Sequence, residues 1–136
     1  MKLVTVEEMR RLEREADAGG WSYATMMEQA GRAVAEAILA RREVRECPVL
    51  VLVGPGNNGG DGLVAARYLQ QAGASVTCYI GKRKNLDADE NACLARERGV
   101  IFALGDEDTD RGELCRLMSR AEVIVDALLG LSLIHI

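Results

Sequence analysis

Hydrophobic residues form short apolar segments that alternate with stretches of helical spacing. Residues 49–53 are all apolar, which is typical of a strand covered on both faces, as in a parallel α/β sheet. Residues 74–80 alternate between Val, Cys or Ile and other side chains, and mainly apolar segments cover 100–104 and 121–125. The pattern therefore predicts four strands, and Asp126 follows the last of them.

Polar residues placed three positions before a glutamate mark the starts of four predicted helices. In such a capping box the first side chain accepts a backbone N–H bond, and the glutamate reaches back to the cap. The four pairs are Thr5 and Glu8, Thr25 and Glu28, Asp87 and Glu90, and Asp110 and Glu113. Asp61 is the predicted cap of a further helix, which runs to about residue 71 and ends at Gly73.

Apolar spacing assigns two helices to the chain before the first strand. The first is expected over 6–17 and the second follows Thr25. Gly31 in the second helix costs roughly 1 kcal/mol relative to alanine. We interpret it as a point of close packing against a strand or another helix. In the helix after Asp110, the residues expected to face the core are Leu114, Leu117 and Met118.

Two helices followed by strand–helix repeats predict an α/β protein with a doubly wound, Rossmann-like parallel sheet. The length of 136 residues favours a single domain over 1–136. In such sheets ligands bind outside the carboxyl ends of the strands, where the strand order reverses. The glycine-rich turn at 54–62 and Asp126 both follow strands. We therefore expect them to meet at one edge of the sheet.

The turn at 54–62 holds five glycines and two asparagines. We expect this composition to produce a tight turn that uses positive φ angles. The turn lies between a strand and the N-terminus of a helix, so its N–H groups and the helix dipole would point at one spot. That spot favours anions or oxygen-rich ligands.

Composition narrows the functional classes. Hydrophobic residues make up 49% of the chain and aromatic residues only 4%, which predicts an aliphatic core. The net charge of -4 and the lack of a long apolar run favour neither a nucleic-acid nor a membrane partner. The four cysteines lack CxxC spacing, so we expect free thiols and a cytoplasmic location. His135 is the only histidine, which argues against Ser-His or Cys-His catalysis.

The turn matches common nucleotide motifs only in part. Residues 54–59 fit GxGxxG, but 82–84 (Lys-Arg-Lys) stand where a dinucleotide site needs an acidic residue. We interpret that basic segment as a solvated turn, and the alternative is that it favours a 2′-phosphate or the pyrophosphate of a ligand. The P-loop pattern fails because no Gly-Lys-Ser/Thr follows. Asn57, Asn58 and Asp61 offer hard oxygen ligands suited to group I and II cations. The alternative is that they supply only left-handed backbone conformations and a helix cap.

The sequence GNNGGDG at 56–62, placed after an apolar strand, closely resembles the signature of the NAD(P)H-hydrate epimerases, the YjeF N-terminal domain family. Three further stretches agree with that family, at 4–9, 27–31 and 125–130. The resemblance extends from the start of the chain to about Gly130. It implies a three-layer α/β/α fold with a Rossmann-like sheet, and a homodimer.

The resemblance also implies an activity. The family is an isomerase that interconverts the R and S epimers of hydrated NADH or NADPH in nicotinamide nucleotide repair, with a bound potassium ion. An ATP- or ADP-dependent dehydratase, as a partner or fused domain, then takes the S epimer. The substrate-binding residues implied for this chain are Asn57, Asn58, Gly59, Gly60, Asp61 and Gly130. The implied potassium ligands are Asn58 and Asp126, and no catalytic acid or base is assigned.

The end of the chain departs from the family pattern. After Gly130 the family usually continues with Thr-Gly and a substrate loop, whereas 131–136 read LSLIHI. The family's later strand with an aspartate and a serine has no counterpart in 1–136. We expect an incomplete domain from a truncated or misread coding sequence, with one edge of the sheet unpaired and apolar. Two outcomes stay open for such a chain, which are epimerase activity and weak binding without turnover.

Two other functions compete with the epimerase. The first is a non-catalytic dimerisation scaffold or nucleotide-binding module, similar to the modules of messenger-RNA decapping scaffolds. The intact segment 57–61 and Asp126 argue against it. The second is a nicotinamide oxidoreductase, against which the missing acidic residue and the absence of a suitable histidine both argue.

Overall fold

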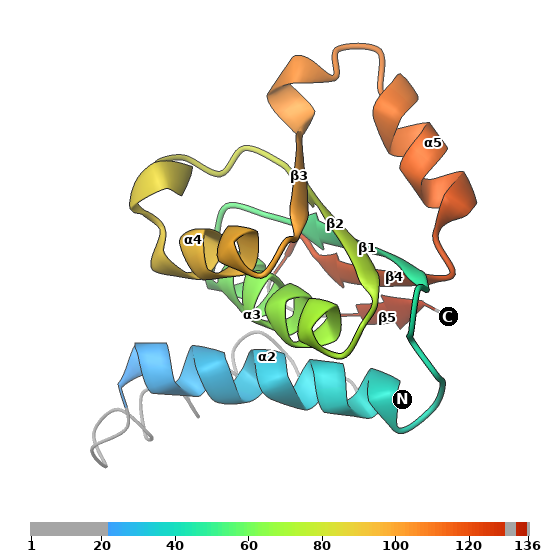
Figure 1. Cartoon of the computed structure of the whole chain (residues 1–136). Helices are drawn as coiled ribbons and strands as arrows, with labels where there is room; N and C mark the ends of the chain where they lie inside the picture. Colours follow the sequence, from blue (N-terminus) through green and yellow to red (C-terminus); the bar gives the residue numbers. More distant parts are fainter. Residues whose placement is uncertain (1–21, 130–132, 136) are drawn as a thin grey trace.

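A five-stranded sheet with the order β3-β2-β1-β4-β5 lies at the centre of the computed structural model, which describes residues 22–129 and 133–135 (Figure 1). The strands are β1 (Pro48–Val53), β2 (Ser75–Ile80), β3 (Ile101–Leu104), β4 (Val123–Ala127) and β5 (Leu133–His135). The chain moves outward from β1 to β3 and then returns to the other side of β1 as β4. The first four strands are parallel, so the doubly wound prediction is confirmed.

The edge of the sheet beyond β4 differs from our expectation. We expected it to be unpaired, but β5 runs antiparallel to β4, with Asp126 opposite Leu133. The short segment 133–135 thus supplies backbone hydrogen bonds to that edge. The helix predicted over 6–17, its cap Thr5 and the predicted site residue Gly130 lie outside the described residues.

Helices lie on both faces of the sheet. They are α2 (Tyr23–Leu39), α3 (Asn57–Gln71), α4 (Glu90–Glu97) and α5 (Gly112–Arg120), with short 3-10 turns at Leu86–Ala88 and Gly105–Glu107. Figure 1 shows α3 and α4 beneath the sheet, α2 beyond α3, and α5 on the opposite face. The predicted three-layer α/β/α arrangement is confirmed. Among the described helices, none is long and apolar enough to cross a bilayer.

The predicted capping residues are wrong at the starts of α2, α4 and α5. Helix α2 begins earlier than expected, because the Ser22 hydroxyl accepts the N–H of Thr25 at 3.1 Å. Helix α4 begins after Asp89 rather than at Asp87, since the Asp89 carboxylate accepts two backbone N–H groups of the first turn. For α5 the carboxylate of Asp108 accepts two N–H groups of the first turn, while Asp110 accepts only that of residue 112.

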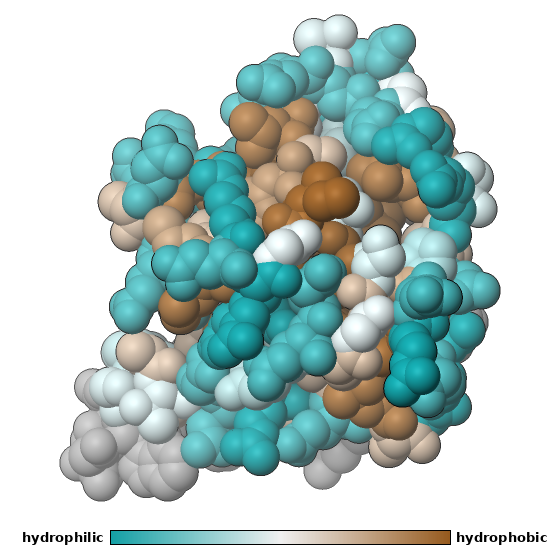
Figure 2. Space-filling model, viewed as in Figure 1, coloured by the Kyte–Doolittle hydropathy of each residue, from teal (hydrophilic) through white to brown (hydrophobic). Residues whose placement is uncertain are grey.

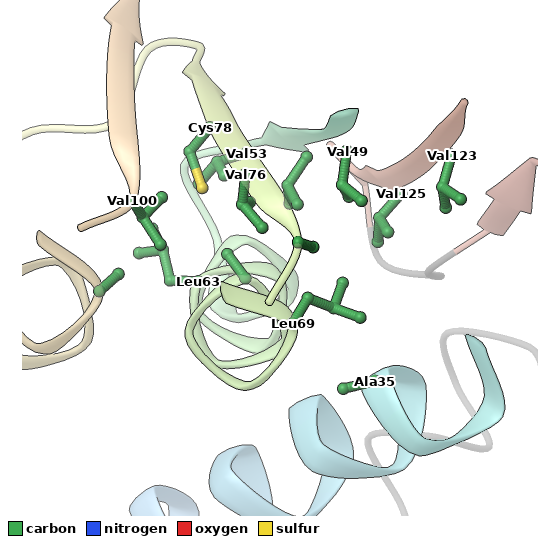
Figure 3. Packing of buried hydrophobic residues seen from close by; sticks show 14 of the residues in the cluster. Ala35, Val49, Val53, Leu63, Leu69, Val76, Cys78, Val100, Val123 and Val125 are labelled. Atoms are coloured by element: carbon green, nitrogen blue, oxygen red, sulfur yellow. The ribbon is translucent and has the colours of Figure 1, made fainter. Parts of the chain in front are cut away.

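The core between the sheet and α3 is aliphatic, as predicted. Figure 3 shows valines of β1, β2 and β4 pointing toward Leu63 and Leu69 of α3. Both leucines are fully buried. Cys47 and Cys78 are buried free thiols, and burial raises the pKa of the Cys78 thiol. Helix α2 completes this layer by packing on α3, where Ala35 and Ile38 join the core.

Gly31 is a point of close approach between α2 and α3. A Cβ added to Gly31 would lie 2.5 Å from Cβ of Val64 and 2.7 Å from the backbone oxygen of Asp61. Real Cβ atoms do not approach other atoms so closely, so one of the two helices would have to move. Our interpretation of Gly31 as a close-packing position is therefore confirmed.

Helix α5 covers its face of the sheet only loosely. A groove of about 720 Å³ lies between α5 and this face of β1, β2 and β3. Ile101 on β3 is 62% exposed and Met118 on α5 is 45% exposed. Figure 2 shows hydrophobic side chains gathered in the hollow between β3 and α5. The expectation that Met118 faces the core is therefore wrong, because its side chain is exposed and does not line the groove, whereas Leu117 does.

A hydrogen-bonded hub attaches the start of α5 to β2. The Tyr79 hydroxyl donates to the Asp108 carboxylate at 2.9 Å, and Arg111 donates to the same hydroxyl and to the backbone oxygen of Gly105, each at 2.9 Å. Burial raises the pKa of Tyr79 and the hydrogen bond from Arg111 lowers it. The effect of burial is the larger one, so the pKa is raised. Burial raises the pKa of Asp108, but the N–H bonds from the first turn of α5 outweigh burial, so that the pKa lies below its usual value.

Candidate functional site

The glycine-rich turn lies at the carboxyl end of β1, where the strand order reverses. The N–H of Gly54 donates to the backbone oxygen of Ala127 at 3.0 Å, which extends the β1–β4 ladder past the end of β1. In the same ladder Leu52 is opposite Asp126. The glycine turn and the end of β4 therefore meet at one edge of the sheet, as predicted. This is the position at which doubly wound sheets bind ligands.

The glycines of this turn serve a different purpose from the one we predicted. Within the described residues, positive φ angles occur at five positions, none of them in 54–62, so that expectation is wrong. Four of the five glycines are required by lack of space instead, whereas nothing lies within 4 Å of a Cβ added to Gly56. Added Cβ atoms would collide with the backbone of Leu128 at Gly54, the backbone oxygen of Gly54 at Gly59, the sulfur of Met27 at Gly60, and Cβ of Ala127 at Gly62.

The two asparagines and Asp61 belong to helix α3 itself. The helix starts at Asn57 with Gly56 as its N-cap, so Asp61 lies in the second turn and is not the cap we predicted. None of the three residues has a left-handed backbone conformation. The alternative interpretation, that they serve only as αL residues and a helix cap, is therefore wrong. Asn57 is exposed, whereas Asn58 and Asp61 are each only 8% exposed.

Asp126 lies near the end of β4 and is half-buried. One of its carboxylate oxygens accepts the N–H of Leu128 at 3.2 Å. Side chains alternate along a strand, and Val125 and Ala127 face α3, so Asp126 lies on the opposite face of the sheet. Asn58 is one helical turn before Gly62, whose added Cβ would meet Ala127. Both predicted cation ligands therefore lie on elements that meet at the β1–β4 junction.

The chemistry available at this edge is that of oxygen ligands and backbone N–H groups. The first N–H groups of α3 point out of its N-terminus and carry the positive end of the helix dipole. They suit a phosphate or another anion. The amide oxygen of Asn58 and the carboxylate of Asp126 suit a hard cation such as K⁺. In 22–129, no cluster of three His, Cys, Asp or Glu side chains offers an alternative metal site.

Arg83 is a component of the site that the sequence interpretation missed. We interpreted 82–84 as a solvated turn, which is correct for Lys82 and Lys84 but wrong for Arg83. The Arg83 side chain is 13% exposed, and its Nη1 donates to the backbone oxygens of Gly54 at 3.1 Å and Gly56 at 2.8 Å. All three residues of 82–84 are basic, so the sequence does not reveal which of the three side chains turns inward.

The segment 27–31 holds α3 in place from the other side. Met27 packs on Gly60, and Gly31 packs on Val64, so two positions four residues apart on α2 meet two such positions on α3. Glu28 accepts hydrogen bonds from Arg67 and Tyr68 of α3. Burial opposes these bonds, but the hydrogen bonds prevail and lower the pKa of Glu28. This segment therefore fixes the helix that carries the site.

Comparison with known proteins identifies relatives for nearly the whole chain. The family described as YjeF-related protein N-terminus matches residues 23–135. An NAD(P)H-hydrate epimerase of Rhodobacter capsulatus is 41% identical over 97% of this chain and 63% of its own length. One of Elusimicrobium minutum is 37% identical over 96% of this chain and 62% of its own length.

A longer relative and a solved structure agree with these matches. A bifunctional NAD(P)H-hydrate repair enzyme of Thermofilum pendens is 36% identical over 98% of this chain and 26% of its own length. The crystal structure of the yeast protein YNL200c superposes with a TM-score of 0.77 at 27% identity, covering 95% of this chain and 57% of that one. This chain thus spans less than two thirds of the length of these relatives.

Proposed function

Because this chain belongs to the family of YjeF-related protein N-termini, we propose that it acts in the epimerisation of hydrated NADH and NADPH. Relatives that carry the printed name NAD(P)H-hydrate epimerase support this reaction. The observation that carries the proposal is the burial of Asn58 and Asp61 in the first two turns of α3, at the β1–β4 junction. An isomerase of this kind converts the R epimer to the S epimer and the reverse.

The proposed substrate-binding residues are those of the glycine turn. The backbone N–H groups of Asn57 and Asn58 would receive the pyrophosphate, since they lie at the N-terminus of a 15-residue helix. The missing side chains of Gly59 and Gly60 let this turn pack closely against Gly54 and Met27. Asn57, Asn58 and Asp61 would contact the remaining polar groups of the substrate, and Gly130 would begin a second contact segment.

The proposed cofactor is a potassium ion held by Asn58 and Asp126. The donor set fits this ion, because amide, carboxylate and backbone carbonyl oxygens are the ligands that hard cations prefer. When bound, the ion would neutralise phosphate charge and polarise nearby oxygens. Residues 54–62 would position the same substrate through their backbone, independently of the ion.

Epimerisation at the hydrated carbon requires its C–O bond, or the ring, to open and then close on the other face. A positioned carboxyl group in its protonated form would assist by giving its proton to the departing oxygen, and the resulting carboxylate would take a proton back when water is added again. Asp61 is a buried carboxylate in the second turn of α3, and we propose it for this proton transfer. A packed environment around Asp61 would limit the entry of other water molecules.

The proposed partners are a second copy of this chain and a dehydratase that consumes the S epimer. Bifunctional repair enzymes among the relatives support a dehydratase that is fused or separate. The proposed location is the cytoplasm, which the free thiols of Cys47, Cys78, Cys93 and Cys115 support.

The test is a coupled assay with a mixture of R- and S-hydrated NADH and a dehydratase that accepts only the S epimer. We expect this chain to make consumption of the mixture complete and faster than spontaneous epimerisation. Asp61→Asn should abolish the acceleration, while Glu97→Gln on the far end of α4 should keep it. The proposal is wrong if the wild-type chain consumes the R epimer no faster than buffer does.

A further inference from the structure

Arg83 connects three separate parts of the molecule around the glycine turn. It follows β2, and the N–H of Gly81 donates to the backbone oxygen of Val53 at 2.8 Å, which keeps the ends of β2 and β1 together. Its Nη1 binds the backbone oxygens of Gly54 and Gly56, and its Nε donates to the Asp89 carboxylate at 2.8 Å. One guanidinium group therefore ties the turn to the start of α4.

Asp89 fixes the direction of the guanidinium group. One oxygen of its carboxylate caps α4 by accepting the N–H groups of Asn91 and Ala92, at 3.1 and 3.2 Å. The other oxygen accepts the Nε–H of Arg83. The two side chains are 13% and 15% exposed, so the ion pair is largely shielded from water. A shielded pair is costly to break from one side, which gives the arginine a single orientation.

The bond to Gly56 controls a peptide group of the ligand site. The oxygen of Gly56 also accepts the N–H of Gly59, at 3.1 Å, in the first turn of α3. In a trans peptide the C=O and the N–H point in opposite directions. Holding the oxygen of Gly56 between Arg83 and Gly59 therefore directs the N–H of Asn57 outward from the helix N-terminus, toward the proposed pyrophosphate position.

We propose that Arg83 is a positioning residue that holds the glycine turn in its ligand-binding conformation through the backbone oxygens of Gly54 and Gly56. This inference rests on the proposed function for the identity of the ligand, a hydrated nicotinamide dinucleotide. Arg83 acts on the pyrophosphate end of that ligand, which is remote from the carbon that reacts. Its loss should weaken binding of the ground state and the transition state alike.

The kinetic test compares Arg83→Gln with Lys84→Gln, which removes the same charge from the exposed neighbouring position. We expect Arg83→Gln to raise KM for hydrated NADH roughly 10-fold, by analogy with the loss of residues that orient ligand-binding groups. The value of kcat should stay within about twofold, because only uniform binding is lost. Arg83→Lys should recover part of the loss, since a lysine can reach one carbonyl but lacks the fork. Lys84→Gln should leave KM unchanged.

A second variant tests the ion pair if Arg83→Gln does not fold. Asp89→Asn keeps a good N-cap for α4 but removes the charge that orients Arg83. We expect it to raise KM by a smaller factor than Arg83→Gln does. Asp87→Asn is the matched control, because Asp87 is fully exposed and forms only a 3.4 Å pair with Arg96. A KM for Asp89→Asn equal to that of Asp87→Asn would overturn the proposal.

Amide hydrogen exchange of the unliganded chain separates this inference from the proposed function. We expect Arg83→Gln to accelerate exchange at 57–60, and Lys84→Gln to leave it unchanged. That result would support the positioning role even if the wild-type chain had no epimerase activity. Equal exchange in both variants, or a fall in kcat at constant KM, would overturn it.

Discussion

The two faces of the sheet are covered to very different extents. On one face, α3 packs so closely on α2 that glycines are needed at Gly31 and Gly60, and so closely on the sheet that a glycine is needed at Gly62. On the other face, α5 leaves a groove of about 720 Å³ above the strands and none of its own residues is buried. The glycine turn and the start of α3 belong to the closely packed face, whereas Asp126 of the candidate site lies on the other face. The comparison shows that, among the described residues, packing is tighter around α3 and the glycine turn, whose backbone groups belong to the candidate site, than around α5.

The largest expected contrast is in how much the free energy of unfolding falls when a side chain is removed from each face. Leu63 on α3 is completely buried, whereas Met118 on α5 is 45% exposed. We expect Leu63→Ala to lower the free energy of unfolding by about 3 kcal/mol, since it leaves a cavity in a packed core. Met118→Ala should lower it by less than about 0.5 kcal/mol. Urea unfolding of both variants measures the difference, and equal losses would mean that α5 packs as tightly as α3.

The next contrast concerns added volume. We expect Gly31→Ala to lower the free energy of unfolding by about 2 kcal/mol, because the new Cβ overlaps Val64 and overpacking outweighs the gain in helix propensity. Gly112→Ala in α5 is the matched change, and its new Cβ would lie 3.1 Å from a carboxylate oxygen of Asp110, a side chain that can move. It should be neutral within about 0.5 kcal/mol. Thermal unfolding of the pair tests this, and a stable Gly31→Ala variant would contradict the packing described for α2 and α3.

The smallest expected effect is local to α5 and depends on pH. The folded-state pKa of Asp108 lies below the ordinary value of 3.8, so its contribution to stability is present above that value and is lost as the pH falls through the lower, folded pKa. We expect amide exchange in the first turn of α5 to become faster over that acidic range. Asp108→Asn should show the faster exchange at neutral pH as well, with little change in global unfolding. Exchange that is independent of pH in the wild-type chain would show that the hub does not hold α5.

The sequence predicted the framework of the fold better than its local details. The apolar run at 49–53, the alternation at 74–80 and the turn at 54–62 predicted the parallel strands and their meeting with Asp126. The spacing of apolar residues can be read within one segment at a time. It predicts β1 and β2 correctly because both strands bury most of their apolar residues.

The details that were missed depend on contacts between distant segments. Ser22, Asp89 and Asp108 displaced the predicted caps, since several polar residues near a helix start can accept the same N–H groups. The inward direction of Arg83 depends on the carbonyls of Gly54 and Gly56, which are more than 25 residues away in the sequence. Nothing in the composition of 82–84 encodes that choice.

The different neighbours of the glycines have a consequence for how this turn can change during evolution. Gly54 and Gly59 are opposed by backbone atoms, so no second substitution can make room for a side chain at either position. Gly60 is opposed by the side chain of Met27 alone. A smaller residue at 27 would therefore permit alanine at 60, so covariation between these two positions is sterically open. Sequences that replace Gly60 should also carry a smaller residue at 27.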